Sequence, residues 1–266
     1  WSWRRRDVDK MEAKIKQIFS YIPKKENFGE RPVYEIADNK APIVAIVTDP
    51  EATQTQMEVE YKKDKLPKEV SLAMPGYVMN LASSLISSVL SERFEEITMQ
   101  ADAPFAAAMA GYSELVKSKD AFQMVVVPKE GKELEGLNAL LLEAEKMKRF
   151  GFTNAELERA KTNMLKNFEK SYNERDNQKS ISLAREYIRH YLSNEPIPGI
   201  EFEYQTVQMI LPQLKTEMIN QLAKSYVSDT NVVISVMAPE KANVKVPSES
   251  QILAAIDATQ KAELTA

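Results

Sequence analysis

One histidine, His190, and no cysteine are available for metal binding or proton transfer in the 266 residues. A catalytic zinc needs three protein ligands and an open position for water, and His190 has no second histidine at helical spacing. Glu186 precedes it by one turn near the end of a predicted helix, where the helix dipole favours a surface histidine. Carboxylates could bind Ca²⁺ or Mg²⁺, but no loop has the required Asp/Asn spacing with glycine. The sequence therefore predicts no metal site and no catalytic residue in this chain.

Nucleophilic and phosphate chemistry lack their usual motifs as well. A serine nucleophile would have to use His190 as its base, and no Gly-x-Ser-x-Gly turn is present. The seven glycines are dispersed, so no phosphate-binding loop is predicted. Four carboxylates gather where two helices are expected to meet: Glu143, Glu145, Glu156 and Glu158. Members of each pair are two residues apart and do not share a helix face, so we interpret them as solvated helix surface.

Composition excludes two further classes of partner. The net charge is −4, from 35 basic and 39 acidic residues that are interleaved along the chain. This leaves no broad cationic face for nucleic acid. No run approaches the roughly 18 apolar residues that a membrane-spanning helix needs, and no signal-peptide pattern is present. We therefore expect neither a nucleic-acid partner nor a membrane span, and the compartment stays open.

Alternating or β-branched apolar patterns predict the strands. The predicted strands are Ile43–Val47, Met57–Tyr61, Phe105–Gly111, Phe122–Val127 and Val232–Val236, with Val33–Ile36 as a possible short strand. Apolar residues at helical spacing predict the helices. These are a first helix with a buried face of Met11, Ile15, Ile18, Phe19 and Ile22, then Met74–Met99, Leu134–Arg149, a helix ending near Tyr172, Ile181–Leu192, Glu201–Leu211 and one opening at Thr216. This order predicts an α+β fold, a mainly antiparallel sheet layered with helices in two layers.

A corner between two of these helices is specified by local residues. Gly151 can adopt the left-handed conformation that closes a helix. Thr153 and Glu156 have the spacing of a capping box, and Phe152 and Leu157 have that of a hydrophobic staple. One helix is therefore expected to end here and another to begin at a fixed angle.

The corner segment, Gly-Phe-Thr-Asn-Ala-Glu-Leu-Glu-Arg-Ala-Lys from Gly151 to Lys161, resembles the Gly-Phe-Thr-x-x-Glu-Leu-x-x-Ala-Lys segment of the insulinase-like (pitrilysin) zinc metallopeptidase family. Shorter similarities follow in the family's order between Val8 and Lys241. They are Val8–Glu12, Thr48–Glu51, Ser91–Glu96, Tyr172–Glu174 and Val236–Glu240. Peptidases of this family contain repeated α+β domains, of which one carries His-x-x-Glu-His and zinc.

That zinc motif is absent here, so the chain resembles a non-catalytic domain of such a metalloendopeptidase. The resemblance implies a chamber-forming, peptide-binding domain that works with a catalytic domain in the same or a partner chain. That catalytic domain would hold the zinc, and no cofactor is expected in this chain. The alternative is a structural or assembly protein, because the family includes subunits of respiratory complexes that have lost peptidase activity.

One predicted strand is a candidate peptide-binding segment: Ala106, Ala107, Ala108, Met109, Ala110 and Gly111. Its small side chains would leave the backbone open to another extended chain, and in relatives an edge strand at the corresponding place can anchor the substrate's end. Under this interpretation, a proline at Met109 would weaken peptide binding. In the favoured alternative, these small residues lie under a helix in a tight layer between sheet and helix. The small residues of Ala82–Ser88 likewise allow close approach to a neighbouring element.

We expect the domain to extend over residues 1–242. Residues 243–266 are predicted as a linker and a short docking helix, which begins at the capping box of Ser248 and Gln251. The chain opens at Trp1 without an initiator methionine, which favours a fragment or a processed product of a longer protein.

Overall fold

The computed structural model describes residues 7–23, 29, 32–241 and 244–265, which belong to two compact units, one up to Tyr34 and one from Glu35. The first unit contains helix α1 (Val8–Phe19), which begins at Asp7, whose side chain accepts a hydrogen bond from the Lys10 N–H. Every residue of α1 is exposed, so its predicted buried face is not seen. An amphipathic helix buries that face only against another element, and the described residues of this unit contain none.

The second unit contains five strands and eight α-helices among its described residues. The strands are β1 (Ile43–Asp49), β2 (Gln56–Asp64), β3 (Phe105–Val116), β4 (Lys119–Pro128) and β5 (Val232–Pro239). The helices are α2 (Lys68–Ser71), α3 (Met74–Thr98), α4 (Glu133–Phe150), α5 (Asn154–Asn173), α6 (Ser180–Ser193), α7 (Ile200–Ile210), α8 (Thr216–Tyr226) and α9 (Glu249–Lys261). All five predicted strands are therefore present, whereas residues 33–36 form no strand.

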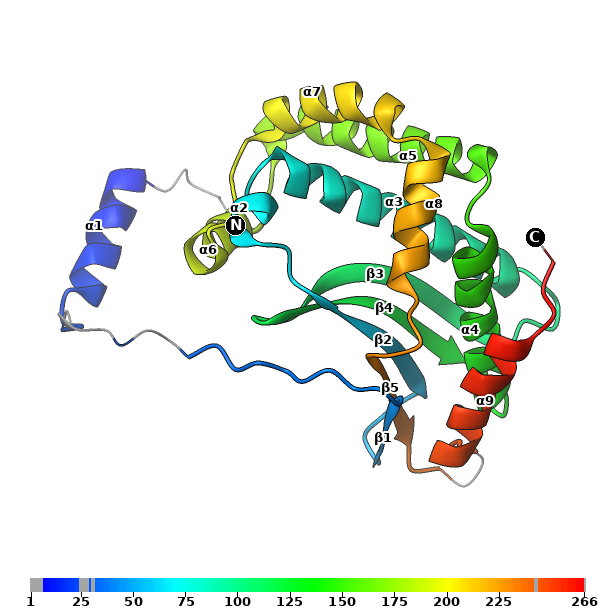
Figure 1. Cartoon of the computed structure of the whole chain (residues 1–266). Coiled ribbons are helices and arrows are strands. Elements are labelled where there is room, and N and C mark those ends of the chain that lie inside the picture. The colour runs from blue at the N-terminus through cyan, green and yellow to red at the C-terminus, as the bar shows by residue number, and fades with distance from the viewer. Residues whose placement is uncertain (1–6, 24–28, 30–31, 242–243, 266) are drawn as a thin grey trace. The chain divides into compact units, whose positions relative to one another are not determined.

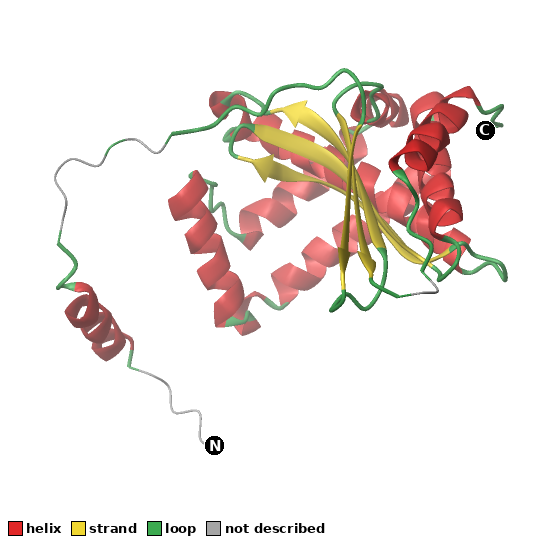
Figure 2. Ribbon diagram, turned by 90° about the horizontal axis from the view of Figure 1, so that it is seen from below, coloured by secondary structure: helices red, strands yellow, loops and turns green. Residues whose placement is uncertain are grey.

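The five strands form one sheet in the order β1-β5-β2-β4-β3. β1 pairs with β5 in parallel, and the other three pairings are antiparallel. Figures 1 and 2 show helices gathered on one face of this twisted sheet. The predicted α+β class, with a mainly antiparallel sheet, is confirmed.

The two faces of the sheet differ in burial. The buried side chains that face the helices include Met57, Val59, Tyr61, Phe122, Met124, Val126, Ile234 and Val236. On the opposite face Glu58, Glu60, Gln123 and Val125 are partly exposed. This alternation is what an antiparallel sheet with one packed face requires.

The helical layer is built around α3 and α4. α3 packs along β3, α4 packs on β4, and α5 joins α3 to α7. α8 and α9 both pack on α4. Arg149 holds the end of α9 by donating hydrogen bonds to the carbonyl oxygens of Gln260 and Ala262, at 2.6 and 2.7 Å. The predicted capping box of Ser248 and Gln251 begins α9.

The corner between α4 and α5 has the geometry that its sequence predicts. Gly151 has the positive φ expected of a closing glycine, 73°, although its ψ of −152° lies outside the left-handed helical region. Thr153 and Glu156 form the capping box. The guanidinium of Arg93 on α3 donates to the two carboxylate oxygens of Glu156, at 2.6 and 3.0 Å. It also donates to the Gly151 carbonyl at 3.0 Å and lies 5.0 Å from the centre of the Phe152 ring.

The interpretation of the four corner carboxylates as solvated surface is wrong for three of them, Glu143, Glu145 and Glu156. Glu145 is 7% exposed and accepts a hydrogen bond from Arg149 at 2.7 Å. The side chain of Glu156 is 18% exposed because it lies against Arg93. Arg149 beside Glu145 and Arg93 beside Glu156 offset the cost of removing these two carboxylates from water. Both side chains can therefore be largely buried. The side chain of Glu143 is 12% exposed and pairs with Lys146, whereas Glu158 is exposed beside Lys161.

The Glu156 carboxylate makes the stability of the fold depend on pH. Its hydrogen bonds to Arg93 and Thr153 outweigh burial and lower its pKa from 4.5 to about 2. Its stabilisation is therefore present above pH 4.5 and lost as pH falls through about 2. We expect Glu156→Gln to lower the free energy of unfolding by about 2 kcal/mol at pH 7, because it removes charge-assisted hydrogen bonds.

Urea unfolding between pH 7 and pH 2.5 measures this effect, and the difference from wild type shrinks over the acid half of that range. Glu158→Gln is the matched control, because its exposed carboxylate contributes about 0.5 kcal/mol or less. Equal stability of Glu156→Gln and wild type at pH 7 would contradict the role given to the pair.

Candidate functional site

The predicted peptide-binding segment, residues 106–111, lies within β3 at an edge of the sheet. β3 pairs with β4 on one side. Its other side has no strand neighbour in the part of the chain that the structure describes. An edge of this kind presents backbone N–H and C=O groups that another extended chain can pair with.

The Ala110 N–H shows which backbone groups of β3 face outward. It donates to the side-chain oxygen of Ser91 on α3, at 3.0 Å, and so points away from β4. In an antiparallel pair, residues alternate between facing the partner strand and facing away. The register is regular from Ala107 to Glu114. The backbone groups of Ala108 and Tyr112 therefore also face outward, whereas those of Met109 face β4.

Only some small side chains of β3 lie under a helix as the alternative interpretation expects, because Ala106 and Ala107 are exposed. Ala108, Ala110 and Tyr112 pack against the core on the side of α3. Met109 points to the opposite face and is 59% exposed. Ala108 and Ala110 thus allow α3 to approach closely, and the backbone edge beside them is still open. The two interpretations of this segment do not exclude each other.

A groove of about 590 Å³ runs between α3 and the edge of β3. One wall is the polar face of α3: Asn80, Ser83, Ser84, Ser87, Ser88 and Ser91. The other wall is the strand segment Ala110, Gly111 and Tyr112, with Glu195 contributing from the loop after α6. The groove therefore combines a strand edge with a row of hydroxyl groups.

The hydroxyl groups of this wall differ in their partners. Ser83 and Tyr226 share a hydrogen bond of 2.5 Å. The Tyr226 ring stacks on Tyr112 at 5.0 Å, and burial raises the pKa of both tyrosines. Ser91 accepts from Ala110. The side-chain oxygen of Ser87 is buried and has no hydrogen-bond partner among the described residues.

The sequence contains a signal for this wall. Ser84, Ser87 and Ser91 are spaced at i, i+3 and i+7, which places them on one face of a helix. The small side chains of Ala82–Ser88, by contrast, predict only close packing against a neighbouring element. Close packing is correct at Ala82, which is 6% exposed, but the serine face borders a groove.

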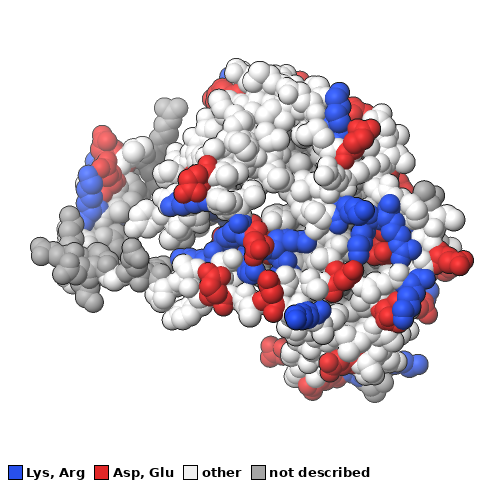
Figure 3. Space-filling view, viewed as in Figure 1, with Lys and Arg blue, Asp and Glu red and all other residues white. Residues whose placement is uncertain are grey.

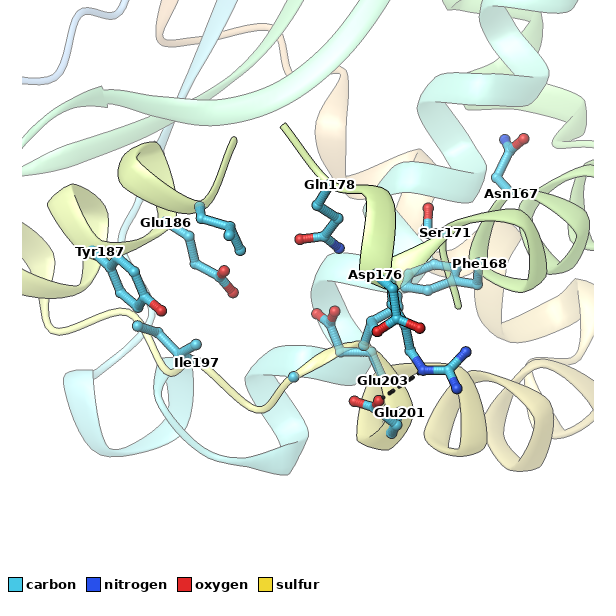
Figure 4. A pocket seen from close by; sticks show the side chains of 14 residues that line it. Asn167, Phe168, Ser171, Asp176, Gln178, Glu186, Tyr187, Ile197, Glu201 and Glu203 are labelled. Atoms are coloured by element: carbon cyan, nitrogen blue, oxygen red, sulfur yellow. Dashed lines mark ion pairs between the residues drawn. The ribbon is translucent and has the colours of Figure 1, made fainter. Parts of the chain in front are cut away.

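A second hollow, of about 690 Å³, lies between α5, α6 and α7 (Figure 4). Glu186 and Glu203 both line it, and Arg175 pairs with Glu201 at 3.2 Å. The pKa of Glu203 is raised by burial and by the negative charges of Glu186 and Glu195. This hollow is acidic, and nothing in the structure shows what would occupy it.

The single histidine lies where the sequence predicts. His190 is exposed in the last turn of α6, and its Nδ1 lies 2.7 Å from the Glu195 carbonyl oxygen. Over the described ranges, no three His, Cys, Asp or Glu side chains come close enough together to hold a metal ion.

The surface has the mixed charge that the composition predicts. On the face shown in Figure 3, Lys and Arg side chains lie beside Asp and Glu side chains. Arg159, for example, is about half exposed and pairs with both Glu92 and Glu96. No helix within the described residues is both long and apolar enough to cross a bilayer.

The sequence and the fold are both similar to those of known proteases. A curated protein of Arabidopsis thaliana described as "zinc protease PQQL-like" is 25% identical over 211 residues, which are 79% of this chain and 19% of that protein. The periplasmic protease PqqL of Escherichia coli matches 98% of this chain with a TM-score of 0.80 and 17% identity. The chain has the fold of an insulinase-like peptidase domain. No protein-family model matches the sequence.

Two further structures share this fold. A predicted insulinase family protease from Yersinia pestis has a TM-score of 0.74, with 14% identity over 95% of this chain and 53% of its own. A peptidase inactive domain from Pseudomonas fluorescens has a TM-score of 0.58, with 15% identity over 91% of this chain and 53% of its own. The resemblance to insulinase-like zinc peptidases is confirmed. The chain spans about a fifth of the Arabidopsis protein and 28% of the E. coli PqqL chain.

Proposed function

We propose that this chain is a non-catalytic domain of a zinc endopeptidase, which binds extended peptide segments along β3 and helps to enclose a peptide chamber. Hydrolysis would then be carried out by a zinc-bound water in a catalytic domain of the same or a partner chain. The observation that carries this proposal is the open edge of β3 beside a groove large enough for an extended peptide.

Strand addition suits this edge physically. Main-chain hydrogen bonds supply affinity that does not depend on the peptide's sequence. The outward backbone groups of Ala108 and Tyr112 are available for such bonds. The Ala110 N–H between them already donates to the Ser91 hydroxyl. Displacing the Ser91 hydroxyl would extend the pairing by one more hydrogen bond.

The similar proteins support the peptidase part of the proposal. Both PQQL-type proteins are named as proteases, and the domain from Pseudomonas fluorescens is described as inactive. A fold with one exposed histidine and no cysteine can contribute to proteolysis by holding the peptide. It needs the zinc ligands of another domain for the chemical step.

Strand addition predicts opposite effects for prolines at neighbouring positions of β3. Ala108→Pro removes an outward N–H and keeps a Cβ in place, so we expect the fold to survive and peptide binding to weaken about fivefold. Met109→Pro removes an N–H that faces β4, so we expect it to destabilise the fold. The sequence suggested Met109→Pro as the test of peptide binding. Because the Met109 N–H faces β4, Ala108→Pro is the better test.

Fluorescence anisotropy with a labelled, unstructured peptide measures the binding, and thermal unfolding measures the fold. Val44→Thr on the opposite edge strand is the binding control. A folded Ala108→Pro variant that binds the peptide as tightly as wild type would contradict strand addition. Absence of any peptide binding by wild type would favour the structural or assembly role instead.

The assignment of peptide binding to this chain and of zinc-dependent hydrolysis to another domain is also testable. We expect the purified chain to contain no stoichiometric zinc and to show no chelator-sensitive cleavage of a quenched fluorescent peptide. Cleavage is expected only when a domain with His-x-x-Glu-His is supplied. Elemental analysis and the cleavage assay, with and without chelator, measure both properties. Tightly bound zinc or chelator-sensitive turnover by the chain alone would overturn the assignment as a non-catalytic domain.

A further inference from the structure

We propose that the groove selects peptides with hydrogen-bonding side chains, such as Asn, Gln, Ser or Thr, at the alternate positions that face α3, and that Ser87 determines this preference. The proposal rests on strand addition to β3. It concerns the side chains of the bound peptide, which main-chain pairing alone would not distinguish.

The geometry of a sheet fixes where those side chains point. Successive residues of an added strand project to opposite faces of the sheet. On one face they would lie beside Met109, which is exposed. On the other face they would continue the row of Ala108, Ala110 and Tyr112, which lies on the α3 side. Every second side chain of the peptide therefore meets the wall of α3.

That wall is polar, in contrast to the side of α3 that faces the core. Its core-facing residues include Leu85, Val89 and Phe94, all fully buried. The residues of α3 that line the groove are one asparagine and five serines. An apolar peptide side chain would lie against hydroxyl groups there and bury them without partners, which is unfavourable.

Ser87 is the member of this wall with an unmet hydrogen-bonding requirement. Ser83 is bonded to Tyr226 and Ser91 to Ala110. The Ser87 hydroxyl has no hydrogen-bond partner within the described part of the chain and is hidden from water. A hydroxyl is both donor and acceptor and can rotate about its Cα–Cβ bond. Turned toward the groove, it can bond to either an amide or a hydroxyl group of the peptide.

The test compares two labelled peptides with the same alternating lysines and either Asn or Leu, which are similar in shape, at the positions between them. We expect wild type to bind the Asn peptide about fivefold more tightly, the size of one net hydrogen bond. Ser87→Ala should remove most of this ratio. It should also leave the fold intact, because it deletes an unpaired hydroxyl and a small volume.

Ser182→Ala, an exposed serine on α6 outside the groove, is the control and should keep the fivefold ratio. If both peptides bind equally well to wild type, or if Ser87→Ala keeps the ratio, the proposed selectivity is wrong while peptide binding stands. If neither peptide binds to wild type, both the selectivity and the strand addition are wrong. The two failures are therefore distinguishable.

Discussion

The ion pair between Arg93 and Glu156 connects the parts of the fold on which the groove depends. Glu156 caps the first turn of α5 through Thr153 and binds Arg93 on α3 with the same carboxylate. Arg93 also binds the Gly151 carbonyl, where α4 ends. Three helices are therefore held at one point. Gly151 is needed there because a Cβ would overlap with the side chain of Asn220, which binds the Phe152 backbone from α8.

The position of α3 in turn defines the groove. Arg93 fixes its C-terminal half, and the hydrogen bond between Ser83 and Tyr226 fixes its middle. Between these two points Ser91 contacts the edge of β3, where Ala108 and Ala110 are small enough for a close approach. A wall fixed in this way is already shaped before a peptide arrives, which lowers the entropic cost of binding.

Features set by local residues could be predicted from the sequence, and features set by distant contacts could not. The strands follow from alternation, and the corner follows from Thr153, Glu156 and Gly151, which are neighbours in the chain. The pairing of Glu156 with Arg93 depends on a residue far along the chain, so the sequence near Glu156 predicts a solvated carboxylate. The sheet order and the outward direction of the Ala108 backbone likewise depend on strand pairing, which one strand's sequence does not specify.

The central claim is that an extended peptide pairs with the outer edge of β3. Amide hydrogen exchange followed by NMR, with and without a bound peptide, tests it most directly, because each amide of β3 is observed separately. The account predicts that the amides of Ala108 and Tyr112 exchange more slowly when the peptide is bound. The Met109 amide, which faces β4, should be protected in both states. Unchanged exchange at Ala108 and Tyr112 in a saturated complex would contradict the account.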